Sequence, residues 1–172
     1  MPVIYTLGHS TRSLEELIAL LKRNKIETLV DIRRYPGSRR NPQFGRKTLN
    51  SSLAAAGIVY TEIAGLGGRR KPLPDSANAA WQNAGFRGYA DHMSTPEFEK
   101  GLAKLLELAA RSRVALMCAE ALPWRCHRTL LADAIFARGV QVEHIISESD
   151  VRRHELTPFA RVETGRVSYA PL

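Results

Sequence analysis

Short apolar segments alternate with amphipathic helical segments along most of this chain of 172 residues. The apolar segments have the length and the β-branched content of strands; they are VIYTL (3–7), TLVDI (28–32), IVYTEI (58–63), RVALMC (113–118) and VQVEHI (140–145). Helices are predicted at 13–24, 46–56, 96–111 and 124–138. Such alternation builds βαβ units, whose strands are parallel and whose helices cover the sheet. We therefore expect an α/β fold over residues 1–172, a single domain with a mostly parallel β-sheet flanked by helices, as a Rossmann-like three-layer structure or a partial barrel.

Local signals refine this pattern. Ser13, followed three residues later by Glu16, has the spacing of a capping box and predicts the start of the first helix. Residues 64–95 are rich in Gly, Pro and Asn, so they are predicted to form a lid-like loop or to carry short helices of their own. In the polar, basic tail that follows residue 147, we expect a final helix and an edge strand near 166–169.

The chain is strongly basic, with a formal net charge of +8. Most of the excess is arginine, which indicates a polyanionic partner but says nothing about the fold. The sequence contains no apolar run near the roughly 20 residues that cross a bilayer, and its start lacks the features of a signal peptide. We therefore expect a cytoplasmic protein with no membrane partner, in which both cysteines are reduced.

Polar and basic residues follow the predicted strands rather than precede them. GHSTR (8–12) follows the first strand, RRYPGSRR (33–40) follows the second, and CAEALPWRCHR (118–128) begins at the end of the fourth. Because the carboxyl ends of parallel strands meet at one edge of a sheet, these side chains should converge on a common cavity. The planar fork of arginine suits phosphate and carboxylate groups, so we predict an anion pocket. Its candidate ligand-binding residues are Ser10, Arg33, Arg34, Arg39, Arg69, Arg125 and Arg128.

Titratable residues at the same edge are candidates for catalysis. His9, Asp31 and Glu120 are predicted to transfer protons, although the carboxylates could instead neutralise and orient the arginines. Cys126 and His127 are the other candidate catalytic residues. If the last helix begins near 124, its positive end and the neighbouring arginines lower the pKa of the Cys126 thiol.

The cysteines also permit other interpretations. Cys118, at the end of a buried strand, fits a small core residue. Six residues separate it from Arg125, one more than in the phosphate loop of a thiol phosphatase. Zinc ligands are available in Cys118, Cys126, His127 and His9, but no closely spaced C-x-x-C pair is present, so no metal site is assigned. His127 also fits a core histidine on the sheet-facing side of its helix.

The motifs taken together resemble the prokaryotic family known as domain of unknown function 488. The matching segments follow the family's order: TLGHST (6–11), LVDIRRYPGSRRNPQF (29–44), GLGGRR (65–70), FRGYADHMSTPEF (86–98), CAEALPWRCHR (118–128) and VEHI (142–145). The resemblance implies a compact α/β domain and assigns no residue a role. The motif positions that it supports are His9, Ser10, Asp31, Arg33, Pro36, Cys118, Glu120, Cys126, His127 and Arg128.

Three functions remain open from the sequence. The leading hypothesis is a hydrolase or transferase that acts on a phosphate-bearing small molecule, a nucleotide or a nucleic acid, with arginines holding the anion and with Glu120 or Asp31 and His9 moving protons. The second is a non-catalytic nucleic-acid-binding module. The third is a thiol- or metal-dependent enzyme that uses Cys118, Cys126 and His127. The sequence identifies neither a cofactor nor an oligomeric state.

Overall fold

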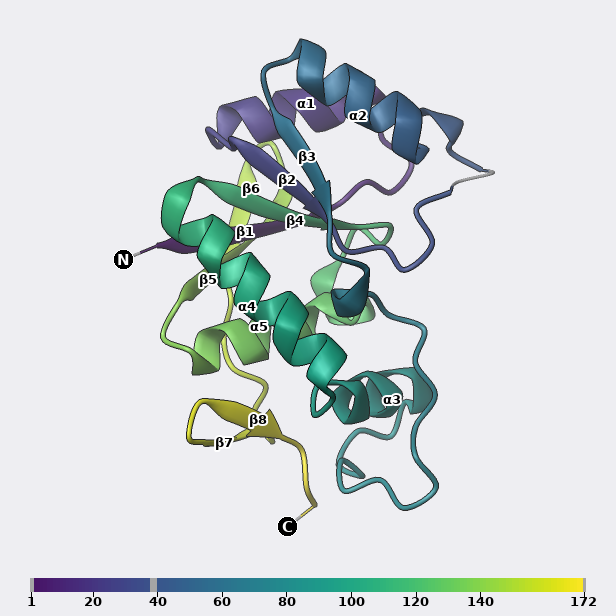
Figure 1. The fold of residues 1–172 in the computed structure, drawn as a ribbon, viewed down its shortest axis with the longest axis vertical. Coiled ribbons are helices and arrows are strands. Elements are labelled where there is room, and N and C mark those ends of the chain that lie inside the picture. Colours follow the sequence, from purple (N-terminus) through teal and green to yellow (C-terminus); the bar gives the residue numbers. More distant parts are fainter. Residues whose placement is uncertain (1, 38–39, 172) are drawn as a thin grey trace.

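A six-stranded sheet runs through the middle of the molecule (Figure 1). The computed structural model describes residues 2–37 and 40–171. The strands lie in the order β3-β2-β4-β1-β5-β6. β1 to β5 are parallel to one another, and β6 pairs with β5 in the antiparallel direction. Their bounds are β1 Val3–Gly8, β2 Thr28–Asp31, β3 Val59–Glu62, β4 Val114–Cys118, β5 Gln141–Ser147 and β6 Asp150–Arg153.

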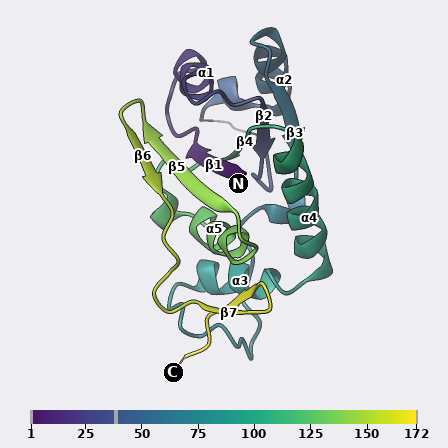
Figure 2. The same cartoon turned by 90° about the vertical axis from the view of Figure 1, so that its left-hand side faces the viewer.

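Helices cover both faces of this sheet (Figure 2). On one face, α1 (Leu14–Arg23) and α2 (Arg46–Ala55) pack their leucines against one apolar cluster. On the other, α3 (Ala84–His92), α4 (Pro96–Arg111) and α5 (Arg128–Ala137) enclose a second cluster. The α/β fold is confirmed in its three-layer form, and the sheet does not close into a barrel. Within the described residues, no helix has both the length and the apolarity needed to cross a membrane.

The sequence signals explain these elements. The hydroxyl of Ser13 accepts a hydrogen bond from the Glu16 amide, and the Glu16 carboxylate accepts one from the Ser13 amide, so the predicted capping box starts α1. All residues of β4 are buried, because helices lie over both of its faces. Successive residues of β4 face opposite layers, which directs Cys118 toward the layer that contains α3, α4 and α5.

The segment between β3 and α4 carries short helices of its own, as predicted. A 3-10 helix at Ala64–Leu66 precedes α3. Tyr89 of α3 is fully buried and donates its hydroxyl hydrogen to the Leu66 carbonyl oxygen at 2.8 Å. The Trp81 ring packs edge-on against Phe86 at 5.2 Å. These contacts fix the segment against the core rather than leaving it as a lid.

The predicted start of the last helix is wrong. Pro123–Arg125 is a 3-10 helix, Cys126 has an extended backbone (φ −138°, ψ 152°), and α5 begins only at Arg128. Proline suits the first turn of either kind of helix, since it lacks an amide hydrogen that would remain unpaired there. Cys126 therefore lies just before α5, not within its first turn.

The predicted final helix is also wrong. The tail forms β6 and a separate two-stranded sheet of β7 (Arg161–Glu163) and β8 (Arg166–Ser168). The strand expected near 166–169 exists, but it pairs with β7 and not with the main sheet. Tyr169, directly after β8, is fully buried, so the tail packs into the second apolar cluster.

A buried chain of hydrogen bonds ties the tail to the sheet. Asp133 of α5 accepts hydrogen bonds from the Tyr169 hydroxyl at 2.7 Å, from His154 Nε2 at 2.8 Å and from the Thr157 amide at 3.1 Å. His154 Nδ1 lies 2.9 Å from Nε2 of His144, whose Nδ1 lies 2.5 Å from the Thr6 hydroxyl. Burial lowers the pKa of His144 to about 3, so His144 is neutral in the folded protein.

Candidate functional site

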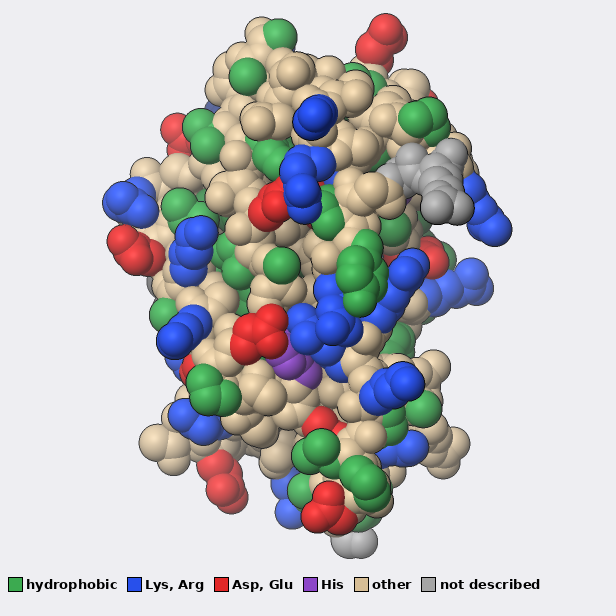
Figure 3. All heavy atoms as spheres, turned by 45° about the vertical axis from the view of Figure 1, so that its right-hand side comes forward, with side chains coloured by type: hydrophobic (Ala, Val, Ile, Leu, Met, Phe, Trp, Pro, Cys, Tyr) green, Lys and Arg blue, Asp and Glu red, His purple; other side chains and the backbone are tan. Residues whose placement is uncertain are grey.

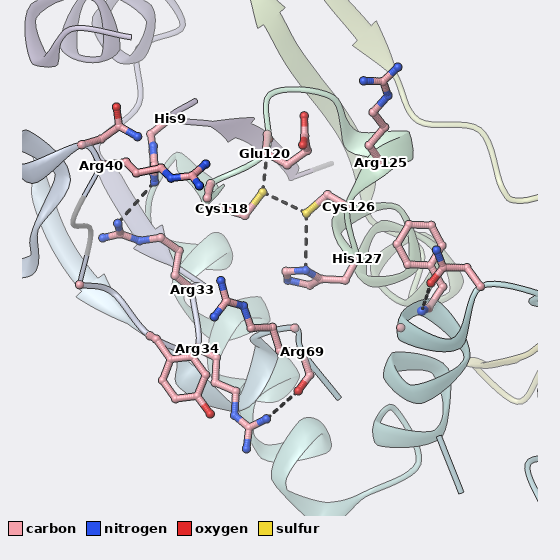
Figure 4. A pocket seen from close by; sticks show the side chains of 18 residues that line it. His9, Arg33, Arg34, Arg40, Arg69, Cys118, Glu120, Arg125, Cys126 and His127 are labelled. Atoms are coloured by element: carbon pink, nitrogen blue, oxygen red, sulfur yellow. Dashed lines mark hydrogen bonds between the residues drawn. The ribbon is translucent and has the colours of Figure 1, made fainter. Parts of the chain in front are cut away.

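A cavity of about 860 Å³ opens at the carboxyl ends of β1, β2 and β4 (Figure 4). Its size lies within the range of small-molecule sites, roughly 300–1,000 Å³. On the face shown in Figure 3, Lys and Arg side chains gather around a histidine. The lining residues are His9, Arg33, Arg34, Tyr35, Gly37, Arg40, Asn41, Gly68, Arg69, Asn83, Gly85, Phe86, Cys118, Ala119, Glu120, Arg125, Cys126 and His127.

The structure brings most of the predicted site residues to this cavity. Those that line it are His9, Arg33, Arg34, Arg69, Glu120, Arg125, Cys126 and His127. Ser10, Asp31 and Arg128 lie next to it without lining it. Arg39 lies outside the described residues.

Arg33 is a cation fixed in position by its neighbours. Its Nε lies 2.9 Å from Asp31 Oδ1, and one terminal nitrogen donates to Asp31 Oδ2 at 2.7 Å and to the Phe44 carbonyl oxygen at 2.8 Å. Asp31 is fully buried and also accepts a hydrogen bond from the Tyr60 hydroxyl at 2.6 Å. Burial alone would lower the pKa of Arg33, but the hydrogen bond and the charge of Asp31 raise it. Asp31 thus orients this arginine from behind the cavity wall.

Other arginines supply positive charge in front of the sulfur atoms. Figure 4 shows the guanidinium groups of Arg40 and Arg69 directed into the space that Cys118 and Cys126 face, whereas that of Arg33 points away from the sulfurs, toward His9. The same view shows Arg125 directed away from the sulfurs. Arg69 has a left-handed backbone (φ 59°), and its carbonyl oxygen accepts a hydrogen bond from Arg34 at 2.8 Å. Non-glycine residues adopt this conformation at some cost in energy, and such strain is concentrated at functional sites.

The two cysteine sulfurs lie together on the cavity wall. Cys118 Sγ is 3.1 Å from Cys126 Sγ, and both thiols are free. Cys126 Sγ also lies 3.5 Å from His127 Nδ1. The hydrogen bond from Cys118 lowers the pKa of Cys126 well below that of an ordinary thiol, and His127 and Arg128 act in the same direction. Burial raises the pKa of Cys118. Of the two thiols, Cys126 is therefore the one that ionises more readily.

Arg128 supports this charge assignment from below the cavity. Its side chain is 1% exposed and donates to the carbonyl oxygens of Glu120 at 2.9 Å and Ala121 at 3.0 Å. Its Nε–H is buried without a hydrogen-bond partner, and within residues 2–37 and 40–171 Arg128 forms no ion pair with a carboxylate. A buried cation is costly unless a countercharge lies nearby. Arg128 lowers the pKa of Cys126, so a thiolate at Cys126 would supply such a charge.

Two glycines allow the backbone to approach this site closely. A Cβ atom at Gly8 would lie 1.7 Å from the Glu120 carbonyl oxygen, so only glycine permits the turn after β1 to contact the turn after β4. A Cβ atom at Gly68 would lie 2.6 Å from Nδ1 of His127. His127 is the N-cap residue of α5 and lines the cavity, instead of lying on the sheet-facing side of a helix. Its Nε2 is buried without a hydrogen-bond partner within the described part of the chain.

His9 is the other histidine at the cavity. Its ring stacks on Phe44 with the ring centroids 4.5 Å apart, and its Nδ1 lies 2.9 Å from the Ser10 carbonyl oxygen. Burial lowers the pKa of His9, and the nearby charge of Arg33 adds to this effect. His9 is therefore neutral at pH 7, with Nδ1 donating to the Ser10 carbonyl oxygen and Nε2 lying 3.5 Å from a terminal nitrogen of Arg33.

Some residues that line the cavity were not predicted from the sequence. Cys118 fits a core residue by its position at the end of a strand, yet its sulfur lines the cavity beside Cys126. Phe86 of α3 and Asn83, the N-cap residue of that helix, form part of the wall. Phe86 begins the matching segment 86–98, but no motif includes Asn83. In the described residues, no group of three or more histidine, cysteine or carboxylate side chains is arranged to hold a metal ion.

Comparison with known proteins identifies the family to which the chain belongs and gives no individual relative. Neither the curated proteins nor the solved structures compared with this chain give a match. One family model matches residues 13–135, which include β2, β4, Cys118 and Cys126, and thus more than half of the chain. The protein therefore belongs to the family described as Domain of unknown function DUF488.

Proposed function

We propose that this protein is a thiol-dependent enzyme that acts on an anionic, phosphate-bearing substrate. One observation carries the proposal: the Cys126 sulfur, with Cys118 and His127 beside it, faces a cavity into which the guanidinium groups of Arg40 and Arg69 point. A thiolate is the reactive form of cysteine, and guanidinium groups bind phosphate oxygens through paired hydrogen bonds. The cavity is larger than inorganic phosphate requires, so it has room for the rest of a substrate.

Each group near the cavity has a part in this proposal. Cys126 is the nucleophile, and Arg33, Arg40 and Arg69 hold the anion. His9 and Glu120 lie on the same wall and are available to move a proton to or from the reacting groups. Arg128 and Asp31 act from behind the wall, as positioning residues for the thiolate and for Arg33.

Alkylation rates test the proposal without knowledge of the substrate. We expect iodoacetate, an anion, to modify Cys126 at least about tenfold faster than neutral iodoacetamide, relative to the same ratio for free glutathione, because the cationic cavity concentrates anions. Inorganic phosphate should slow the modification by competition. The Arg40→Ala/Arg69→Ala double variant should lose most of this preference. The matched control is Arg23→Ala/Arg111→Ala, which removes the same charge from exposed positions on α1 and α4.

Modification is measured by mass spectrometry of the intact protein, with Cys126→Ser as the blank. Equal relative rates for the two reagents in the wild type would refute the anion pocket. A loss of preference in the control variant as large as in the cavity variant would assign it to net charge and also reject the site.

The pH dependence of alkylation tests the role of Cys118. Because the pKa of Cys126 is lowered, its alkylation rate should stay near its maximum well below the pH at which an ordinary thiol loses reactivity. Cys118→Ala removes the hydrogen-bond donor, so the profile should move to higher pH while the plateau at high pH stays the same. Cys118→Ser keeps a donor and should lie between the two. Superimposable profiles for all three proteins would show that Cys118 does not stabilise the thiolate.

A nucleic-acid-binding module is the second candidate, because of one feature at the cavity. Tyr35 is 59% exposed, and the guanidinium carbons of Arg34 and Arg69 lie 5.4 and 5.8 Å from its ring centroid. An exposed aromatic ring between cations suits a stacked base. This function would depend on Tyr35 and on salt concentration, and would not depend on Cys126.

A further inference from the structure

The arrangement of the two sulfurs goes beyond what a single nucleophile needs. Their separation of 3.1 Å exceeds the length of a disulfide bond, about 2.05 Å, by only about 1 Å. Cys118 ends the buried strand β4, whereas Cys126 lies in an extended segment between a 3-10 helix and α5. One sulfur is thus held by the sheet, and the other lies in the connection that leads into α5.

The two sulfurs also differ in protonation and in surroundings. Cys126 Sγ lies 3.5 Å from His127 Nδ1, and the hydrogen bond from Cys118, with His127 and Arg128 nearby, lowers its pKa. Burial raises the pKa of Cys118, and its thiol lies 3.5 Å from the Glu120 carbonyl oxygen, to which it donates. A disulfide exchange needs a thiolate that attacks first and a thiol that attacks second. The pair offers one of each.

We propose that the reduced protein has a further activity, the reduction of low-molecular-weight disulfides that carry negative charge, with Cys126 as the attacking sulfur and Cys118 as the resolving sulfur. The inference rests on the proposed function, because it uses the same thiolate and the same guanidinium groups. It adds a second step that Cys126 alone cannot perform.

The two steps balance without any other reactant. The Cys126 thiolate attacks one sulfur of the disulfide RS–SR, which forms a Cys126–SR mixed disulfide and releases RS⁻. The Cys118 sulfur then attacks Cys126 and displaces the second RS group, while the proton of Cys118 leaves with it as RSH. The protein thiols lose two electrons and form the Cys118–Cys126 disulfide, and RS–SR gains them to give RS⁻ and RSH.

The charge of the cavity determines which disulfides enter. Arg40 and Arg69 face the sulfurs, and Arg33 lines the same cavity beside His9. Among the described residues that line the cavity, Glu120 is the single carboxylate. A carboxylate- or phosphate-bearing disulfide is therefore attracted, and a cationic one is repelled. Displacement of the first RS⁻ is also favoured, because these cations stabilise the departing thiolate.

The test uses three disulfides of different charge with the full chain in its reduced form. The probes are oxidised glutathione, which is anionic, bis(2-hydroxyethyl) disulfide, which is neutral, and cystamine, which is cationic. We expect the second-order rates to fall in that order, by about tenfold or more from the first to the last. Intact mass and thiol counting should show the loss of both thiols with no adduct in the wild type.

Two single variants separate the steps. Cys118→Ser should keep the first step and accumulate a stable glutathione adduct on Cys126. Cys126→Ser should not react at a comparable rate. In Arg40→Ala/Arg69→Ala, the rates for the three probes should converge, whereas in Arg23→Ala/Arg111→Ala they should keep the order of the wild type.

Each contrary result rejects a defined part of the inference. A wild-type protein that retains the glutathione adduct as long as Cys118→Ser does would show that Cys118 does not resolve it. A neutral or cationic probe that reacts fastest would show that the cavity does not select anions in this reaction. If iodoacetate still modifies Cys126 preferentially and phosphate still protects it, the proposed function stands and this further activity alone is lost.

Discussion

Replacing Asp133 by alanine is expected to lower the free energy of unfolding by about 3–5 kcal/mol. Asp133 is fully buried and accepts hydrogen bonds from Tyr169, from His154 and from the Thr157 amide. Alanine would leave all three donors buried without a partner, and such groups retain the cost of losing water without the gain of a bond. The tail from β6 to β8 would lose its main polar attachment to α5.

Graded variants make this prediction specific. Tyr169→Phe removes one donor and should cost about 1 kcal/mol, because Asp133 keeps its other partners. Asp150→Ala is a control, since Asp150 forms an exposed ion pair with Arg152 that contributes about 1 kcal/mol or less. Stability is measured by denaturant unfolding. A cost for Asp133→Ala no larger than that of Asp150→Ala would mean that the buried chain does not hold the tail.

Acidification is expected to destabilise the protein through His144 between about pH 6.5 and pH 3. The pKa of His144 is lowered to about 3 in the folded protein by burial, with His154 and Arg128 adding to the effect, whereas the unfolded value is near 6.5. The unfolded chain therefore binds a proton in this range that the folded protein does not bind. His144 therefore contributes its full share to the free energy of unfolding above pH 6.5. This contribution falls as the pH decreases, by up to about 1.4 kcal/mol per pH unit.

The slope of stability against pH is the measurement. His144→Gln does not titrate, so the free energy of unfolding should depend less steeply on pH in this variant, whatever its stability at pH 7. The pKa values of His9 and His92 are lowered in the same direction and account for a residual slope. A wild-type slope equal to that of His144→Gln from pH 6.5 to 4 would show that His144 is not held neutral.

The alternation of strands and helices was sufficient to predict the three-layer fold, because parallel strands buried on both faces leave a plain apolar pattern. The tail was not predictable in the same way. β6 alternates exposed charged residues with few apolar ones and exists because β5 offers it an edge. The Asp133 contacts that hold the tail join residues far apart in the chain, and no local pattern encodes them.

The position of the site was predictable from the sequence, but the roles of its individual residues were not. Placement after parallel strands locates His9, Arg33 and Cys126 at one cavity. Sequence position does not reveal that Arg128 lies beneath the wall and binds carbonyl oxygens. The direction of its side chain depends on the residue at which α5 begins, and a shift of that start by one residue would change it. Nor does the spacing of Cys118 and Cys126 reveal their contact, because the Pro123 turn folds one sulfur back onto the other.

The strand order has a consequence for synthesis of the chain on the ribosome. β1 and β2 are joined by α1 yet do not touch in the sheet, because β4 lies between them. Ile4 pairs with Val114 of β4 on one side and with Val142 of β5 on the other. β1 therefore stays unpaired until these two strands, which are translated much later, have been synthesised. Until β4 emerges, the nascent chain carries an open slot with two unpaired strand edges. Such a slot accepts a strand from any neighbouring copy, which makes strand exchange between nascent chains the expected route of misfolding for this topology.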